Sequence, residues 1–508
     1  MNRSDQFARF AGREAVSSDL KRKSVLGALM TGAGGAADFV LRLGSTLILA
    51  RLLVPEYFGL VAMVTAVTRI AERFATLGLS TATVQAPNIT HGQCSNLFWI
   101  NAGVGVLFGA ALVFFSPAIA HFYEDQRLQA IAVALSLNFV SIGLTVQHEA
   151  LLRRQMKLPQ IAAMRVAATF LSVFLAIALA LGGFNYWALV WKEVIQLFLT
   201  AVGAWILCPW LPSLPSRRVD MHRLLGFGRD MTLTQLLLAV SAQLDSVLIG
   251  RFAGAVDLGL YRQAANLMQA PIQRLNAPIA TVSQPGLSIL QFEPARYRRY
   301  YQRILFVVGL LTIPLGVFTA IYAREIVLVA LGPKWLGATV FLRIFGLMAS
   351  IRPAIATTGM VLVTCGKSGR FLMLSVVYSA TSLILMFVGI RWGAVGIATA
   401  QVSTAVLLMP WLVHYSLAGS PVSVGAFWRS ASRPLVASLT MAAALLLLQN
   451  FTHLESALLS LTAACGTAIA VYFLTLNFLP GGRDQLQSLL NELTAALRKR
   501  SSAGGPGQ

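Results

Sequence analysis

Charge is scarce in this chain, and acidic charge is the scarcest. Only 12% of the 508 residues are charged, and 19 Asp and Glu stand against 40 Lys and Arg. Water-soluble domains carry about a quarter charged residues. A chain with half that content and 56% hydrophobic residues therefore has little surface to present to water. Its mean hydropathy of +0.70 indicates that a lipid bilayer surrounds most of the chain.

Cysteine and histidine are also rare, and neither has the spacing of a metal site. We therefore expect free thiols, no metal ligands and no catalytic residues. No glycine-rich phosphate loop follows a strand, which argues against an ATP-driven engine within the chain. The polar and basic N-terminus precedes a long apolar segment that retains Asp38 and Arg42, unlike a cleavable signal peptide. These features predict a protein that is not an enzyme and has no cofactor, with proton or sodium coupling left open.

Long apolar runs are separated by short turns along almost the whole chain. Each run is long enough to cross a bilayer as a helix, and no connection is long enough to hold a catalytic domain. The sequence therefore predicts an all-α, polytopic membrane protein of about 14 transmembrane helices. The predicted spans are 29–50, 58–82, 96–116, 128–148, 160–182, 186–207, 224–250, 258–283, 303–322, 337–363, 371–390, 394–416, 434–450 and 456–479.

Basic residues gather in alternate connections between these spans. Lys and Arg hold loops on the cytoplasmic side of a membrane, so the alternation predicts an even number of spans with both termini in the cytoplasm. The loop that contains Arg127 falls on the opposite side. Because the basic excess has this explanation, nucleic acid is not needed as a partner. The predicted location is the bacterial inner membrane, with membrane lipids as neighbours.

Two short matches indicate an internal repeat. Arg51 precedes Gly59-Leu60 by the same spacing as Arg251 precedes Gly259-Leu260, and the segment from Gly183 resembles that from Gly393. Six helices separate the equivalent points, so both halves have the same orientation, and such repeats bind substrate where the halves meet. The predicted parts are a cytoplasmic tail (1–24), an N-lobe of six helices (25–207), a linker (208–223), a C-lobe of six helices (224–416), two further helices (434–479) and a second cytoplasmic tail (480–508).

Charged residues at predicted membrane depth are the candidate functional groups. An Arg or Lys at a helix centre costs about 2.5–3.5 kcal/mol, so most must face protein or a water-filled cavity. We expect Lys192, Arg229 and Arg343 to reach the membrane surface instead. The basic residues in this set are Arg42, Arg69, Arg73, Arg165, Lys192, Arg229, Arg262, Arg274, Arg343 and Arg352, and the acidic ones are Asp38, Glu72, Glu193, Asp230 and Asp245.

Helical spacing places several of these charges on shared faces. Asp38 and Arg42 are four residues apart on the first helix, and Arg69 and Arg73 share a face of the second beside Glu72. A polar stripe follows the eighth helix at 4-3-4 spacing: Arg262, Asn266, Gln269 and Gln273. These faces either line a cavity or form salt bridges that only hold helices together, and the sequence leaves both readings open.

The excess of cations favours an anionic substrate over a cationic one. Guanidinium offers paired, permanently charged donors to phosphate oxygens, so a pyrophosphate-bearing lipid headgroup is a good chemical match. Carboxylates at membrane depth are candidates for binding a proton or a sodium ion, and these are Asp38, Glu72 and Asp245.

Three segments then resemble a known family. Residues 50–63 (ARLLVPEYFGLVAM) are similar to the first-loop signature of bacterial polysaccharide flippases. Residues 77–85 (LGLSTATVQ) resemble the end of their second helix, and residues 97–101 (LFWIN) open the third as in the exopolysaccharide branch. The resemblance implies the fold of the multidrug/oligosaccharidyl-lipid/polysaccharide exporter superfamily, in which two six-helix lobes enclose a central cavity. It also implies a task, the flipping of undecaprenyl-pyrophosphate-linked oligosaccharides to the periplasmic leaflet.

The resemblance implies a cationic cavity on helices one, two, seven and eight. It carries over to Arg42, Arg69, Arg73 and Arg262, and it implies a polymerase and chain-length proteins as pathway partners. Two alternatives stay open. One is a drug exporter or a peptidoglycan-precursor flippase of the same fold, which the cation excess and the first-loop signature disfavour. The other is a membrane polymerase or ligase, which needs a large periplasmic loop that this sequence lacks.

Overall fold

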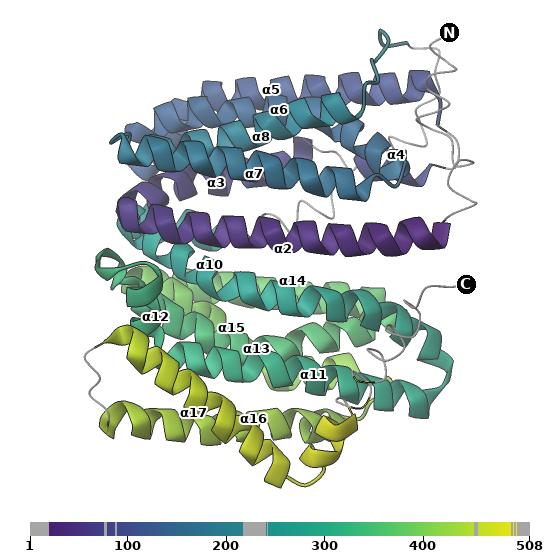
Figure 1. Cartoon of the computed structure of the whole chain (residues 1–508), viewed down its shortest axis with the longest axis vertical. Helices are drawn as coiled ribbons and strands as arrows, with labels where there is room; N and C mark the ends of the chain where they lie inside the picture. The colour runs from purple at the N-terminus through teal and green to yellow at the C-terminus, as the bar shows by residue number, and fades with distance from the viewer. Residues whose placement is uncertain are drawn as a thin grey trace, which may run out of the picture. The chain divides into compact units, whose positions relative to one another are not determined.

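The computed structural model describes residues 20–75, 79–86, 89–216, 240, 242–451, 456–488, 491 and 494. Helices account for nearly all of these residues, and no β-strand occurs among them (Figure 1). The chain divides between Arg262 and Gln263 into two compact units, which are described separately below.

The first unit contains seven complete helices and the start of an eighth among its described residues. They are α2 (Leu20–Leu52), α3 (Pro55–Ala75), α4 (Leu79–Gln85), α5 (His91–Tyr123), α6 (Arg127–Arg154), α7 (Leu158–Leu181), α8 (Trp187–Leu207) and the first part of α10 (Leu244–Ile289). Helix α2 packs against α7, and α6 packs against both α5 and α8. A buried cluster that includes Phe98, Leu151 and Trp210 forms part of the core.

The second unit continues from α10. It contains α11 (Pro294–Ile321), α12 (Ala323–Ala330), α13 (Ala338–Thr364), α14 (Ser368–Gly389), α15 (Gly393–Leu417), α16 (Val424–Phe451) and α17 (Ala457–Phe478). One core cluster surrounds Tyr297, Tyr301 and Phe427. A second lies among α11, α16 and α17 and includes Phe306 and Tyr472.

The described helices confirm the all-α polytopic architecture. Thirteen of the fourteen predicted spans are covered mainly by described helices, whereas the predicted span 224–250 lies largely outside the described residues and meets α10 only from Leu244. The predicted loop after that span is replaced by a single break within α10. Gly254 has φ 86° and ψ −179° there, a conformation that glycine adopts without steric cost.

Ten helical stretches of the described residues are long and apolar enough to cross a membrane, one of them covering both α14 and α15. Helices α3 and α10 are not in this set. Both carry charges along their length, including Arg69 and Glu72 on α3 and Arg262 and Arg274 on α10. The helices that miss the hydropathy criterion are therefore those that hold many of the candidate site residues.

The repeat predicted from the sequence recurs in how helices pack. In the first half, a methyl group placed on Gly143 of α6 would lie 2.7 Å from the carbonyl oxygen of Asn101 on α5. In the second half, a methyl group on Gly346 of α13 would lie 2.6 Å from the carbonyl oxygen of Gly316 on α11. Small residues let helix backbones approach closely where no hydrophobic effect drives association in lipid. The third and fourth helices of each half therefore meet through glycine.

The turns repeat as well. Residues Met156 and Gly366 both have positive φ, 57° and 71°, after the fourth helix of each half. In both turns the next lysine N–H donates to a carbonyl five residues back, at 3.0 Å in the first and 2.8 Å in the second, which is the Schellman pattern of helix ends. Gly183 and Gly393 also share positive φ, 80° and 64°, before the sixth helices.

Several basic residues cap the C-terminal ends of helices. Arg154 donates to the carbonyl oxygen of Ala86 at 2.6 Å, just beyond α4. Lys367 donates to the carbonyl oxygen of Gly419 at 2.7 Å, and Arg370 to that of Ala418 at 2.8 Å, just beyond α15. Cations at this end complement the helix dipole. These basic residues in the predicted cytoplasmic loops therefore hold the structure together.

Candidate functional site: a charge network in the first unit

One polar cluster joins three helices. On α2, Arg42 Nε donates to Asp38 Oδ2 at 2.8 Å, as their spacing predicted. The hydroxyl of Thr169 on α7 donates to Asp38 Oδ1 at 2.8 Å, and Gln196 on α8 donates to that hydroxyl at 3.2 Å. Asp38 is 19% exposed and Arg42 51% exposed. The carboxylate is therefore held inside the cluster, whereas the guanidinium keeps free surface.

A second cluster lies on α10 on both sides of the Gly254 break. Tyr261 donates its hydroxyl proton to Asp245 Oδ2 at 2.6 Å, and the backbone N–H of Ser246 donates to Asp245 Oδ1 at 2.6 Å. Arg262 donates to Ser246 Oγ at 3.3 Å. Asp245 and Arg262 are both half-buried. Because the carboxylate has two other donors, it does not consume the hydrogen-bonding capacity of the guanidinium.

Electrostatic interactions link these clusters to neighbouring charges. Arg262 interacts with Arg69 on α3, Asp245 and Glu193 on α8. Lys192 on α8 interacts with Glu193 and with Arg42. We call Arg42, Arg69, Lys192, Arg262, Asp38, Glu193 and Asp245 the charge network. Like charges are placed near one another here, which a set of purely structural salt bridges would avoid.

The remaining predicted residues lie on α3 and α10. Arg69 is exposed and Glu72 half-buried on α3, whereas Arg73 lies in the last turn of α3 and its side chain is outside the described part. On α10, Asn266 and Gln273 are exposed and Gln269 is half-buried. The opposite face of that helix is buried, as at Ala264, Met268 and Ile272. The predicted polar stripe is thus the accessible face of α10.

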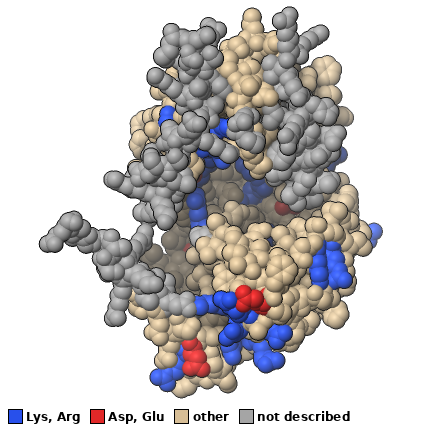
Figure 2. Space-filling view, turned by 90° about the vertical axis from the view of Figure 1, so that its right-hand side faces the viewer, with Lys and Arg blue, Asp and Glu red and all other residues tan. Residues whose placement is uncertain are grey.

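Some charges that the sequence grouped with the site lie elsewhere. Arg165 on α7 forms an ion pair with Glu149 at the end of α6, and Arg153 pairs with the same carboxylate at 3.3 Å. Arg274, Arg343 and Arg352 belong to the second unit, and Arg229 and Asp230 lie outside the described residues. The positive excess that can be assigned to the network is therefore smaller than the sequence count. Figure 2 shows the general excess of basic residues on one face, with more blue Lys and Arg than red Asp and Glu among the coloured atoms.

Sequence reasoning missed Thr169, Gln196, Ser246 and Tyr261. Two of them had a readable signal, because Gln196 lies one turn from Lys192 and Ser246 is adjacent to Asp245. Thr169 and Tyr261 gave none, since single hydroxyls are common in transmembrane helices. Their roles depend on how neighbouring helices are rotated.

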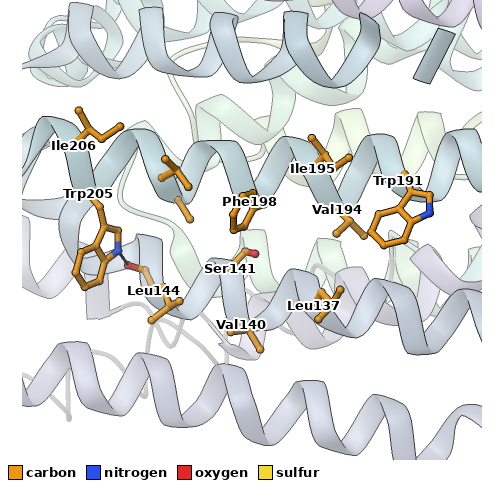
Figure 3. Close-up of a pocket in the computed structure, with 12 residues that line it drawn as sticks. Leu137, Val140, Ser141, Leu144, Trp191, Val194, Ile195, Phe198, Trp205 and Ile206 are labelled. Carbon is orange, nitrogen blue, oxygen red and sulfur yellow. Dashed lines mark hydrogen bonds between the residues drawn. The ribbon is translucent and has the colours of Figure 1, made fainter. Parts of the chain in front are cut away.

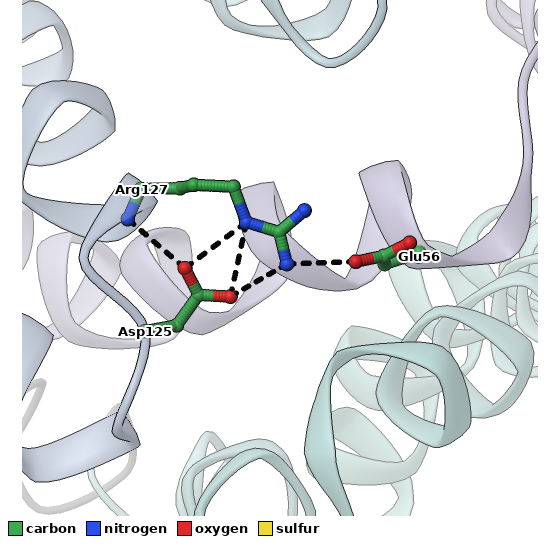
Figure 4. Close-up of polar contacts among 3 residues, drawn as sticks. All are labelled: Glu56, Asp125 and Arg127. Carbon is green, nitrogen blue, oxygen red and sulfur yellow. Dashed lines mark hydrogen bonds and ion pairs between the residues drawn. The ribbon is translucent and has the colours of Figure 1, made fainter.

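A separate ion-pair cluster lies where α5 and α6 connect. Arg127 donates to Asp125 Oδ2 and to Glu56 Oε1, both at 2.7 Å (Figure 4). Its backbone N–H also donates to Asp125 Oδ1 at 2.9 Å. The hydrogen bonds from Arg127 lower the pKa of Asp125 below its usual value. This cluster ties the start of α3 to the α5–α6 turn, which is predicted to lie outside the cytoplasm.

An apolar groove runs between α6 and α8. Its volume is about 750 Å³, and its lining includes Val140 and Leu144 from α6 and Trp191, Phe198 and Trp205 from α8 (Figure 3). The hydroxyl of Ser141 is a rare polar group in this lining. Such a surface suits hydrocarbon rather than a charged headgroup. The charge network is therefore the better candidate for recognising a polar substrate.

The fold defines the class of protein, a multi-pass membrane protein with a MurJ/MATE-like fold. The lipid II flippase MurJ, in an inward closed conformation, matches 88% of this chain and 98% of its own with a TM-score of 0.72 at 13% identity. An inward-facing multidrug resistance MATE family transporter of the MOP superfamily matches 75% of this chain and 95% of its own, with a TM-score of 0.59 at 15% identity. At these identities the likeness establishes the MurJ/MATE-like fold alone.

The family follows from the sequence itself. The model of the family described as "Polysaccharide biosynthesis protein" matches residues 48–340, more than half of the chain, and this protein belongs to that family. The teichuronic acid biosynthesis protein TuaB of Bacillus subtilis is 23% identical over 82% of this chain and 88% of its own. The succinoglycan biosynthesis transport protein ExoT of Rhizobium meliloti is 24% identical over 92% and 94%. The lipopolysaccharide biosynthesis protein WzxC of Escherichia coli is 22% identical over 62% and 65%.

Proposed function

We propose that this protein flips undecaprenyl-pyrophosphate-linked oligosaccharide repeat units from the cytoplasmic to the periplasmic leaflet of a bacterial inner membrane, for exopolysaccharide or lipopolysaccharide biosynthesis. The observation that carries the proposal is the charge network, in which basic side chains from α2, α3, α8 and α10 interact with one another and with carboxylates in the segments predicted to span the membrane. The family membership and the relatives named for succinoglycan transport and lipopolysaccharide biosynthesis support it.

The chemistry of the network fits a pyrophosphate. A guanidinium grips phosphate oxygens through paired hydrogen bonds, and Arg42 keeps about half of its surface accessible. Arg262 donates to a neutral serine hydroxyl, and Asp245 is already bound by Tyr261 and Ser246. These arginines therefore retain donors for an incoming anion.

Alternating access with ion coupling completes the proposed mechanism. A flippase exposes its cavity first to one leaflet and then to the other, and a bound proton or sodium ion can bias that exchange. Asp38 is the favoured coupling residue because Thr169 and Arg42 hold its carboxylate within a three-helix cluster. Asp245 and Glu72 remain candidates. Both termini are placed in the cytoplasm, and the polymerase and chain-length proteins of the pathway are proposed partners.

Deleting the gene in the bacterium that encodes it tests this function. We expect polymer secretion to stop and lipid-linked repeat units to accumulate in the cytoplasmic leaflet. A plasmid copy should restore both. Unchanged lipid-linked intermediates together with altered drug resistance would instead favour a drug exporter, and arrested peptidoglycan synthesis would favour a precursor flippase. Accumulation of flipped but unpolymerised units in the periplasmic leaflet would favour a polymerase.

A further inference from the structure

The first two helices of each half meet at one point within the first unit. In the first half, α2 ends at Leu52 and α3 begins at Pro55; in the second, the break in α10 falls at Gly254. Gly59 and Gly259 are 200 positions apart, as are Pro55 and Ala255. The two turns therefore occupy equivalent positions of the repeat in sequence, although only the second contains a residue with positive φ.

These turns contact each other reciprocally. A methyl group placed on Gly59 would overlap the carbonyl oxygen of Ala255, and one placed on Gly259 would overlap the carbonyl oxygen of Pro55. Each contact becomes the other when the equivalent residues are exchanged, which is the signature of a local two-fold axis. Both glycines are buried. The centre of the contact is thus backbone against backbone, with no room for any side chain.

Ion pairing and packing across the two halves surround this contact. Arg251 forms an ion pair with Glu124 at 2.8 Å, and its guanidinium lies 5.9 Å from the ring centre of Phe122. A methyl group on Gly250 would lie 2.8 Å from the ring of Tyr123 and 3.1 Å from Met63. Because Glu124 is 69% exposed, this ion pair contributes little and breaks readily.

From this geometry we infer that the Gly59–Gly259 contact is the closed outer gate of the transport path. The inference rests on the proposed alternating access and on the predicted topology, which places Arg51 and Arg251 outside the cytoplasm. A gate must close tightly yet open at low cost. At the glycines the two backbones touch, so no substrate can pass between them. No side chains interlock there to resist opening, and only one exposed ion pair, Arg251–Glu124, lies at the edge of the contact. Because the two turns are equivalent elements of the repeat, the surfaces around Gly59 and Gly259 are complementary by symmetry.

Thiol labelling tests the gate without requiring transport. Met63 is 2% exposed and lies beside the contact. In a chain whose four natural cysteines are replaced by alanine, Met63→Cys should react slowly with a membrane-impermeant reagent added from the periplasm. Adding Gly59→Ala should force the turns apart and raise that rate about tenfold. The control is Gly103→Ala on α5, where nothing lies within 4 Å of the added methyl group, and it should leave the rate unchanged.

A reversible cross-link tests whether the gate must open. Cysteines at Glu124 and Arg251, joined by a short bifunctional thiosulfonate, should hold the turns together. We expect polymer secretion to stop on cross-linking and to return after reduction, while each single cysteine treated alike remains active. Full secretion by cross-linked protein, or equal labelling of Met63→Cys with and without Gly59→Ala, would overturn the gate. Failure of the unmodified chain to restore secretion in the deletion strain would overturn the proposed function instead, and the labelling result would still decide the gate.

Discussion

The two halves of the repeat share turn and packing geometry, whereas charges are unevenly divided between the two units of the chain. The turns after the fourth helices both use a residue with positive φ, Met156 in one half and Gly366 in the other. The third and fourth helices meet through Gly143 in the first and Gly346 in the second. In contrast, the long helices α11 and α13 to α17 contain no Asp or Glu, whereas the first unit has carboxylates on α2, α3, α8 and α10.

This difference indicates which sequence positions stay alike in the two halves of a repeat. Positions with unusual φ or close backbone contact are retained because few residues fit them. Charged positions have no such constraint, because a charge in the membrane is costly unless it has a use. Charges concentrated in the first unit therefore mark where function has been added to a duplicated scaffold.

The largest expected effect concerns those charges. Replacing Arg42, Arg69, Arg73 or Arg262 with alanine should each lower polymer secretion about tenfold or more, because a hydrogen bond to a charged group is worth about 1.5–3 kcal/mol. Lysine should recover only part of the activity at residues that grip phosphate. We extend the prediction to Lys192→Ala, since Lys192 belongs to the charge network. Secretion is measured in the deletion strain and normalised to protein in the inner membrane.

Arg343→Ala, in the second unit, is the matched control and should retain most activity. If the Asp38–Arg42 pair is only structural, the double variant Asp38→Ala/Arg42→Ala should recover the activity that Arg42→Ala loses. Normal secretion by all four arginine variants would show that the first unit's charges do not form a binding site.

The next effect tests whether both halves depend equally on glycine packing. Gly143→Ala and Gly346→Ala should each lower stability by about 1–3 kcal/mol, because the added methyl group meets backbone atoms that cannot move aside. Thermal unfolding in detergent measures the loss. Gly369→Ala is the control, since nothing lies within 4 Å of its methyl group. A loss in one half alone would mean that the shared packing has lost its importance in the other.

A smaller effect concerns the pH dependence of thermal stability. The folded-state pKa of Asp125 is lowered by Arg127, so its stabilisation is fully present above the unfolded-state pKa and is lost as pH falls through the folded-state value, below about pH 4. Asp125→Asn should reduce the thermal midpoint at pH 7, and the difference from the native chain should shrink below pH 4. Glu293→Gln, which removes the exposed ion pair with Arg296 in the second unit, is the control and should change the thermal midpoint at pH 7 little. A constant difference for Asp125→Asn at all pH values would contradict the assignment.

The smallest expected effect on stability comes from substitutions at the two equivalent turn residues, Met156 and Gly366. Met156 adopts a conformation that glycine tolerates better, so Met156→Gly should be neutral or stabilising by at most about 1 kcal/mol. Gly366→Ala should be destabilising by a similar amount, because alanine at positive φ is strained. Opposite signs in chemical unfolding would confirm that the turns are equivalent. Destabilisation by Met156→Gly would instead assign its side chain a packing role that outweighs backbone strain.

The sequence predicted the features that depend on local pattern. Apolar run length located the helices, and the four-residue spacing of Asp38 and Arg42 placed both on one face of the first helix, with an ion pair as one of two readings. Features that depend on helix rotation were not readable. Thr169 reaches Asp38 from 131 positions away, and Glu149 captures Arg165 from the next helix. The eighth helix was predicted by its polar stripe, but only the structure shows that the turn before it is one glycine wide.

Helix α8 has a consequence for how the molecule can move. One side lines the apolar groove with Trp191, Phe198 and Trp205, and the other carries Lys192 and Gln196 toward the charge network. Turning this helix by one residue, about 100°, would carry lysine toward hydrocarbon at a cost of about 2.5–3.5 kcal/mol. Its angular register is therefore fixed by the charge network on one side and the apolar groove on the other. If helices slide or tilt during transport, α8 must therefore move with them as a rigid body and not rotate about its own axis.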